Sequence, residues 1–209
     1  FVRLTNARNV LLRGLTFSGC RATAVWFAGC ANCYLDDCTI ERIGVHAAVI
    51  NDSSFCGVFH SRLRKLGGCG VRMRGGDRLQ QRQSGLTVHD CEIGSFCQID
   101  RAYAAALQTN GCGMVMTNNL IYDSPHRAVN TDGNDQYLAR NEIHSVVYEF
   151  SDQSGLDVWC DSTYRGIVSE KNFWHHIGSS LALCGQAGIR LDDAISGVVM
   201  KDNIFYRSS

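Results

Sequence analysis

The fold is decided by segments such as Val198-Val199-Met200-Lys201-Asp202-Asn203-Ile204-Phe205, which has counterparts throughout the chain. Each copy contains alternating apolar residues, a turn residue, a small or polar residue, one spacer and a large apolar residue. The closing apolar residues, which recur every 22 to 31 positions, are Phe17, Ile40, Leu63, Ile93, Ile121, Ile143, Trp174 and Phe205. A recurrence of this length is typical of a solenoid in which each repeat forms one coil.

The position two residues before each closing residue forms a second column. It holds Leu15, Cys38, Ser61, Cys91, Asn119, Asn141, Asn172 and Asn203. Asparagine tolerates left-handed backbone geometry, and its amide can form hydrogen bonds between neighbouring coils. We therefore expect these four successive asparagines to occupy left-handed turns and to form a ladder.

A further short strand recurs between these segments. Its copies are residues 24–27, 48–51, 70–73, 106–109, 128–131, 155–158 and 188–191. Each coil thus has at least two strands that are too short to bury a face alone, and no window sustains the 3.6-residue period of a helix. The sequence predicts an all-β chain, a right-handed parallel β-helix of about eight coils that forms a single domain over residues 1–209.

Composition limits the partners. The 209 residues carry 20 acidic and 20 basic side chains, so no net charge favours nucleic acid. No apolar run reaches the roughly 18 residues of a membrane span. Because the chain begins and ends inside repeats without a signal peptide, we expect a piece of a longer, secreted or extracellular protein. The oligomeric state is left open.

The chain contains 11 cysteines, an odd number. Cys30 and Cys33 have the spacing of a zinc knuckle, but neither a second such pair nor a suitably spaced histidine pair follows. Cysteine is also a common small core residue. We therefore expect buried thiols with one or two disulfides, and predict neither a metal site nor a cofactor.

Strand alternation divides the recurring strand between core and solvent. Inward positions are predicted for Val25, Val49, Val71, Leu107, Val129, Leu156 and Ile189. Outward positions are predicted for Trp26, Ile50, Arg72, Gln108, Asn130, Asp157 and Arg190, and two residues further along for Asp52, Arg74, Asn110, Asp132 and Asp192. Such a face offers hydroxyl partners, a stacking surface and carboxylates to a polysaccharide, although a merely solvated sheet would also be polar.

From about residue 9 onward, the chain resembles the right-handed β-helix repeat proteins related to glycoside hydrolase family 141. The matching motifs lie in the C-terminal half, whereas the N-terminal half matches only as a generic repeat. These motifs are Pro125-His126, Gly133-Asn134-Asp135, Asn141-Glu142-Ile143-His144, residues 149–152, Arg165-Gly166, Leu191-Asp192-Asp193 and Ser196-Gly197.

The resemblance implies hydrolysis of a polysaccharide by two carboxylates, Asp152 and either Asp192 or Asp193. One carboxyl group protonates the leaving oxygen, while the other acts as a nucleophile or activates water. Acids on adjacent coils, about 4.8 Å apart, fit the roughly 5–9.5 Å that glycosidases use. Strand parity favours Asp192 and the family comparison favours Asp193.

Other motif residues have expected supporting roles. Glu149 is a possible third acid, and Asp161 and Arg165 are expected to hold the charge state of the acid pair. His126 is either a substrate donor or a turn residue. Substrate contacts are also predicted for Asn134 and Asp135. Structural or surface positions are expected for His144, His175 and His176, and stacking on sugar rings for Trp26 and Trp159.

The chain departs from the family pattern on the predicted groove. Ser154-Gly155-Leu156-Asp157 replaces a small-apolar-tyrosine sequence, Cys160 replaces an arginine and Arg190 replaces a tyrosine. These changes leave two alternatives open. One is a polysaccharide lyase or epimerase, in which Arg72, Arg74 and Arg190 would neutralise a uronate carboxylate. The other is a non-catalytic module that binds glycan or has a structural role.

Overall fold

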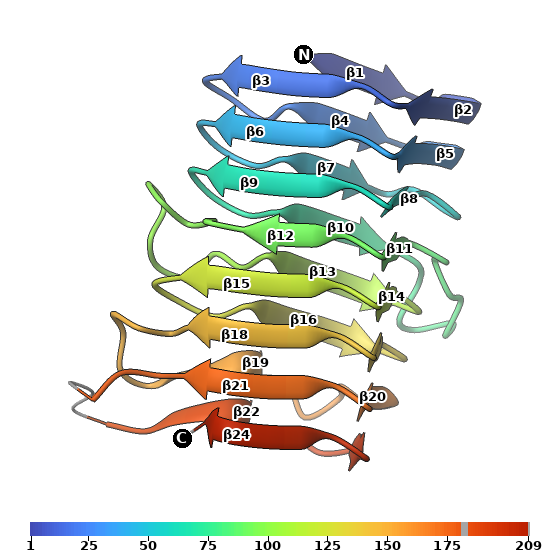
Figure 1. Cartoon of the computed structure of the whole chain (residues 1–209). Helices are drawn as coiled ribbons and strands as arrows, with labels where there is room; N and C mark the ends of the chain where they lie inside the picture. Colours follow the sequence, from blue (N-terminus) through green and yellow to red (C-terminus); the bar gives the residue numbers. More distant parts are fainter. Residues whose placement is uncertain (181–183, 209) are drawn as a thin grey trace.

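The computed structural model describes residues 1–180 and 184–208 and has the predicted fold (Figure 1). Three parallel sheets of eight strands each form eight coils of a right-handed parallel β-helix. Every coil contributes one strand to each sheet, so a coil has three strands rather than the minimum of two expected. In the part of the chain that the structure describes, no helix is long and apolar enough to cross a membrane.

We name the sheets A, B and C. Sheet A contains β1 (Val2–Thr5), β4 (Val25–Ala28), β7 (Ala48–Asn51), β10 (Val71–Gly75), β13 (Leu107–Cys112), β16 (Val129–Asn134), β19 (Gln153–Trp159) and β22 (Gln186–Asp192). Sheet B contains β2 (Arg8–Arg13), β5 (Ala31–Asp36), β8 (Gly57–Phe59), β11 (Thr87–His89), β14 (Val115–Thr117), β17 (Tyr137–Ala139), β20 (Ile167–Glu170) and β23 (Val198–Lys201). Sheet C contains β3 (Thr16–Cys20), β6 (Thr39–Ile43), β9 (Arg62–Leu66), β12 (Glu92–Gly94), β15 (Leu120–Ser124), β18 (Glu142–Val146), β21 (Phe173–Ile177) and β24 (Ile204–Ser208).

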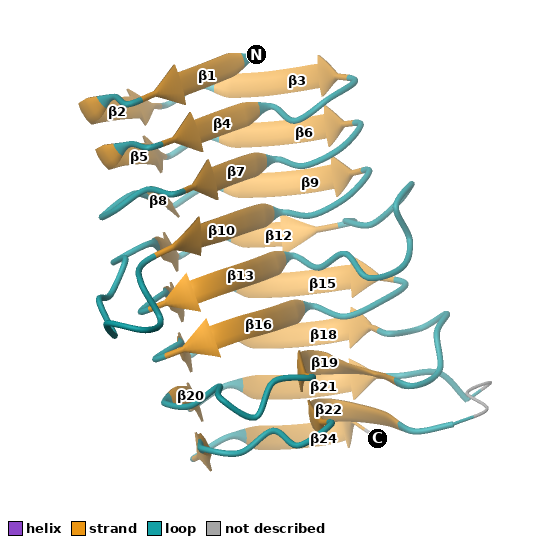
Figure 2. Cartoon of the chain, turned by 180° about the vertical axis from the view of Figure 1, so that it is seen from behind, coloured by secondary structure: helices purple, strands orange, loops and turns teal. Residues whose placement is uncertain are grey.

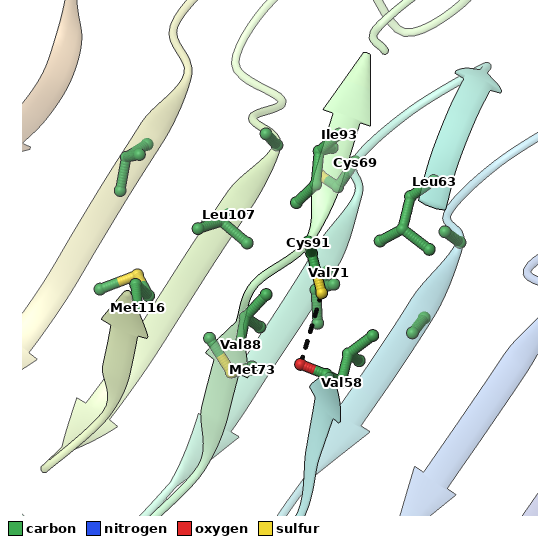
Figure 3. Close-up of a cluster of buried hydrophobic side chains, with 14 of the residues drawn as sticks. Val58, Leu63, Cys69, Val71, Met73, Val88, Cys91, Ile93, Leu107 and Met116 are labelled. Atoms are coloured by element: carbon green, nitrogen blue, oxygen red, sulfur yellow. Dashed lines mark hydrogen bonds between the residues drawn. The ribbon is translucent and has the colours of Figure 1, made fainter. Parts of the chain in front are cut away.

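The core is built from columns of apolar side chains inside the coils. Val71 of sheet A, Val88 of sheet B and Ile93 of sheet C are fully buried and lie in one cluster (Figure 3). In the next coil, Leu107, Met116 and Ile121 occupy the paired positions. Full burial of such a side chain contributes about 1.5–3 kcal/mol, so the repeated columns hold the short strands together.

The expected asparagine ladder is present, but the left-handed turn lies one residue earlier. The backbone N–H groups of Asn119, Asn141 and Asn172 each donate to the side-chain oxygen of the asparagine in the next coil, at 2.9–3.0 Å. The residues with positive φ are Asn118 and Arg140, at 59° and 55°. The preceding residue therefore makes the turn, and the ladder asparagine itself points inward.

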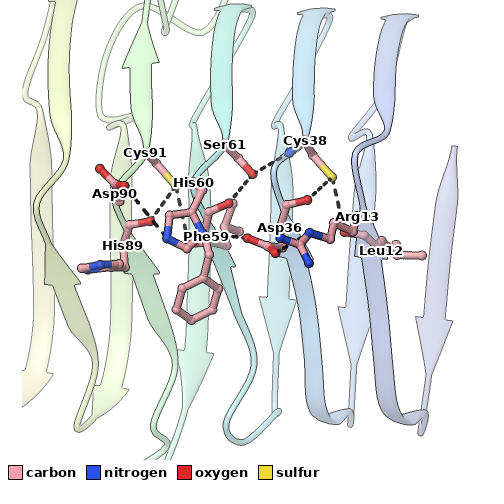
Figure 4. A network of polar contacts seen from close by, with 11 residues as sticks. Leu12, Arg13, Asp36, Cys38, Phe59, His60, Ser61, His89, Asp90 and Cys91 are labelled. Atoms are coloured by element: carbon pink, nitrogen blue, oxygen red, sulfur yellow. Dashed lines mark hydrogen bonds and ion pairs between the residues drawn. The ribbon is translucent and has the colours of Figure 1, made fainter.

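Cysteine and serine occupy the same column in earlier coils. The N–H of Cys38 donates to the Ser61 hydroxyl at 3.0 Å, and the Cys38 thiol lies 3.3 Å from the carbonyl oxygen of Asp36 (Figure 4). Cys91, two coils after Cys38, contacts the carbonyl of His89 in the same way. Burial raises the pKa of the Cys91 thiol to about 12, so it stays protonated and can donate.

The expected one or two disulfides are wrong. All eleven cysteines are free thiols, and eight of them are buried. Their repeated positions reflect the size of a slot between coils, which accepts a small side chain with one hydrogen-bonding atom.

One part of the predicted strand parity is also wrong. Val49 pairs with Trp26 and Arg72 and therefore faces outward, whereas Ile50 faces the core. Consequently Asn51, and not Asp52, follows Val49 on the outer face. Residues 48–50 are all apolar, so alternation could not reveal the register of this strand.

The ladder predicts a large effect for Asn141→Ala. The Asn141 side chain accepts from the backbone and side-chain amides of Asn119 and donates to Met116 and Asn172. Its loss leaves buried partners unsatisfied, so we expect the free energy of unfolding to fall by about 2–4 kcal/mol in urea denaturation.

Asn110→Ala is the matched control, because Asn110 is exposed on the outer face of β13. We expect a change within about 0.5 kcal/mol for this variant. Equal losses in the two variants would contradict a stabilising ladder.

Candidate functional site

The strands of sheet A lie at the front of Figure 2, so the outer face of this sheet is turned toward the viewer. Strand pairing aligns Trp26, Val49, Arg72, Gln108, Asn130, Asp157 and Arg190 in one row. In the row two residues further along, Ala28, Asn51, Arg74, Asn110 and Asp132 are aligned, and Trp159 pairs with Asp192. Parallel strands thus place chemically different side chains in two lines across the coils.

Part of this face is hollowed into a groove of about 570 Å³, which we call the sheet A groove. Its lining includes Trp26, His46, Val49, Asn51, Arg72, Arg74, Gln108, Asn110 and Asp132. The side chains of Arg72 and Arg74 are exposed, and the indole of Trp26 is half-buried. The groove therefore runs from an aromatic side chain, past arginines and amides, to a carboxyl group.

Next to Asp132, the part of the face that carries Asn130 and Asp157 is covered. Arg127 forms an ion pair with Asp157 at 2.7 Å, and each side chain is only 4% exposed. Arg127 also donates to the carbonyl of Tyr103 at 3.0 Å, and its guanidinium lies 5.8 Å from the ring centre of that residue. Asn130 is buried and donates to Asp132 and to the carbonyl of Asp157. Asn130 and Asp157 therefore face outward as predicted, but they are not accessible to a substrate.

Asp132 and Asp157 are the acids of the described residues whose pKa is raised by their surroundings. Burial raises the pKa of Asp132, against the lowering effects of the Asn130 hydrogen bond and the Arg127 charge. Burial likewise raises the pKa of Asp157, against the hydrogen bond and charge of Arg127. Because Asp132 is half-buried and lines the groove, it is the one of the two that a ligand can reach.

The structure brings Asp152 and Asp192 together. Nη2 of Arg190 contacts Oδ1 of Asp152 at 2.9 Å and also contacts Oδ2 of Asp192. Two oxygens on one nitrogen are no farther apart than the roughly 5–5.5 Å between the acids of retaining glycosidases. Asp193 is exposed in the turn after β22, with a φ of 47°, and lies outside this ion-pair group.

The expected roles of Asn134 and Asp161 are replaced by a structural contact. Nε of Arg78 donates to Asn134 at 2.8 Å, and its Nη1 contacts Asp161 at 3.3 Å. The Arg78 guanidinium also lies 4.5 Å from the ring centre of Tyr164. Asp161 therefore pairs with Arg78 instead of the Asp152 and Asp192 group, and Asn134 is buried. Sequence reasoning missed Arg78 because it lies in an irregular loop without a repeat position.

The other motif residues are dispersed. His126 is buried between the rings of Tyr103 and Phe150, and its burial and the Arg127 charge lower its pKa to about 4. Of the two alternatives for His126, this burial disfavours the substrate donor and favours the turn residue. Glu149 forms an ion pair with Arg101.

Asp135 and Arg165 lie outside the ion-pair group of Asp152, Arg190 and Asp192. Asp135 accepts from the thiol of Cys112 at 3.6 Å. Arg165 is exposed beside Gly197. The expected surface loop at His175 and His176 is wrong, since both residues belong to β21 of sheet C.

The buried ion pair generates a pH-dependent prediction. Without Arg127, ionised Asp157 would remain buried and unpaired, which costs about 3–5 kcal/mol. The folded-state pKa of Asp157 is already raised by burial, so stability falls as pH rises through it. Urea denaturation of Arg127→Met should therefore show a larger loss at pH 7 than at pH 4.5.

Asp157→Asn in the Arg127→Met background removes the unpaired charge. This double variant should recover most of the stability lost at pH 7. An equal loss at both pH values, or no recovery in the double variant, would contradict the assignment of this charge pair.

Comparisons with known proteins agree on the architecture. Residues 1–93 match a family model described as a right-handed beta helix region. Two similar solved structures are a mutant and a double mutant of the tailspike protein of E. coli bacteriophage HK620, each in complex with a pentasaccharide. No curated protein sequence matches this chain.

Both tailspike alignments are 11% identical and cover 94% of this chain, with TM-scores of 0.54 and 0.55. The chain spans only 42% of the tailspike chain. At this identity the likeness extends to the fold alone. The chain is thus a right-handed parallel β-helix, an architecture that it shares with these tailspikes.

Proposed function

We propose that this chain binds a polysaccharide along the sheet A groove and hydrolyses it at the acidic end. The observation that carries the proposal is the order of side chains in the groove, from the Trp26 indole through guanidinium and amide groups to Asp132. The likeness to tailspikes whose structures contain a pentasaccharide supports the same class of ligand. We also propose that the chain acts outside the cell, on an extracellular polysaccharide.

The groove has the dimensions and chemistry of an extended glycan site. It crosses the five coils from β4 to β16, which at about 4.8 Å per coil gives a length of about 19 Å. Trp26 offers an apolar ring face, while Gln108 and Asn110 offer both donors and acceptors to sugar hydroxyls. Arg72 and Arg74 add planar donors that suit hydroxyl pairs or a sugar carboxylate.

For hydrolysis, Asp132 is assigned as the general acid and Asp192 as the second carboxylate. A general acid must hold a proton near neutral pH, and burial raises the pKa of Asp132 in that direction. Asp192 instead forms an ion pair with Arg190. Arg190 also contacts Asp152, which we assign to holding Arg190 in place.

We assign an inverting reaction from the positions of the strands that carry these acids. Asp132 and Asp192 lie on β16 and β22 with β19 between them, and two strand spacings amount to about 9.5 Å where these strands pair. Inverting glycosidases separate their acids by about 6.5–9.5 Å to admit a water molecule. Trp159 pairs with Asp192 and is 41% exposed, which leaves a ring face available to a sugar at this end.

Substitution of the two acids tests the assignment. Asp132→Asn and Asp192→Asn should each lower the rate of glycan cleavage at least about 100-fold, because each removes a proton-transfer group. Their melting temperatures should stay close to that of the parent. Product analysis by NMR should show inversion at the anomeric carbon.

Asp193→Asn is the matched control, since Asp193 adjoins Asp192 but lies outside the Arg190 group. It should retain activity within a few-fold. Loss of activity in Asp193→Asn with full activity in Asp192→Asn would overturn the assignment. Glycan binding without turnover by the parent chain would select the non-catalytic module.

Arg72 and Arg74 favour a second candidate, a polysaccharide lyase acting on uronates. Adjacent guanidinium groups in mid-groove can neutralise a sugar carboxylate, but a base is also needed. His46 lies 3.4 Å from Arg72, and burial and the Arg72 charge lower its pKa to about 4. However, Nδ1 of His46 accepts from the N–H of Cys69 at 3.0 Å, so its proton is on Nε2. With this base blocked, we favour hydrolysis, and release of unsaturated, ultraviolet-absorbing ends would reverse that choice.

A further inference from the structure

A second chemical cluster lies on sheet C, a different sheet from that of the groove. Strands β18 and β21 are neighbours in sheet C (Figure 1). Glu142 and His144 belong to β18, and His175 belongs to β21, where it pairs with His144. One ligand atom from each of the three side chains lies within 4.8 Å of the other two. All three are half-buried or exposed, so a solute can reach them.

Ring stacking fixes the orientation of both imidazoles. The Tyr122 and His144 rings are stacked at 5.4 Å and 6°, and the His144 and His175 rings at 4.7 Å and 13°. The ring of Phe173 packs against that of His175, with 4.3 Å between the two ring centres. The column therefore holds two imidazole edges in parallel on adjacent coils before any ligand arrives.

Apart from the contact between His175 and Glu142, the side-chain contacts of these two imidazoles are made by Nδ1, so Nε2 is the nitrogen directed at the cluster. Nδ1 of His144 contacts the Ser145 hydroxyl at 3.0 Å, and Nδ1 of His175 contacts Nδ1 of His176 at 2.8 Å. Nε2 of His175 lies 3.2 Å from Oε1 of Glu142. A ring nitrogen that binds a metal normally has its other N–H held by an outer acceptor, which Ser145 and His176 supply here.

We propose that Glu142, His144 and His175 bind a divalent transition-metal ion, with Zn²⁺ as the representative. Two imidazole nitrogens and one carboxylate oxygen suit borderline ions such as Zn²⁺, whereas Mg²⁺ and Ca²⁺ prefer oxygen ligands alone. Bonds of about 2.0–2.2 Å require the ligand atoms to approach to about 3.3 Å. The separation between Nε2 of His175 and Oε1 of Glu142 already meets this requirement. The His144 ring is stacked nearly parallel to that of His175, so it must turn out of the stack for its nitrogen to point at the same ion.

Zinc titration tests the site directly. Isothermal titration should use Cys160→Ser/Cys184→Ser protein, because the thiols of these two exposed cysteines would compete for Zn²⁺. We expect one equivalent to bind, with a rise in melting temperature. His175→Ala and Glu142→Gln should each weaken binding at least about 10-fold and abolish the rise, since each removes a ligand.

His89→Ala is the matched control. His60 and His89 also lie on neighbouring coils of the outer surface, with Asp36 2.7 Å from His60, but their rings meet edge to face at 6.0 Å (Figure 4). Zn²⁺ binding should be unchanged in this variant. The proposal is overturned if the parent binds no Zn²⁺, if His144→Ala/His175→Ala binds it as tightly as the parent, or if His89→Ala loses binding equally. None of these outcomes bears on the sheet A groove.

Discussion

The structure depends on the in-register stacking of parallel strands, in which each residue lies about 4.8 Å above its counterpart in the next coil. Because of this constraint, residues at equivalent positions of successive repeats lie in a row across the coils. Ile93, Ile121 and Ile143 become continuous core, while Asn119 and Asn141 become a ladder. The same rule aligns the sheet A groove and stacks Tyr122, His144 and His175 on sheet C.

Much of this architecture could be predicted from the sequence, because columns recur at readable positions. The closing apolar residues and the ladder follow from their recurrence along the chain, and most of the outer face of sheet A follows from strand alternation. Prediction failed at residues 48–50, where three consecutive apolar residues hide the parity of β7. Prediction also failed for the cysteines, because the sequence does not distinguish a free cysteine from one in a disulfide bond.

The sequence could predict which side chains of the candidate site face outward, but not which of them are buried. Strand parity correctly placed Asn130 and Asp157 on the outer face, but Arg127 and Tyr103 cover them. That cover, like the contact between Arg78 and Asn134, joins residues far apart in the sequence through irregular loops. The paths of such loops depend on long-range packing, and their sequences contain no periodic pattern from which these contacts could be predicted. For the same reason, Asp132 gained its importance only when its burial was known.

Sheet A therefore combines an open groove, where ligand groups are accessible, with an acidic end whose charges are set by burial and arginine pairing. The most direct test of this account is a crystal structure of the chain with a bound oligosaccharide that it retains in solution. The account predicts sugar rings along the outer face of β4 to β16, with the chain of sugars reaching Asp132. A saccharide bound on sheet B or sheet C, with the sheet A groove empty, would contradict it.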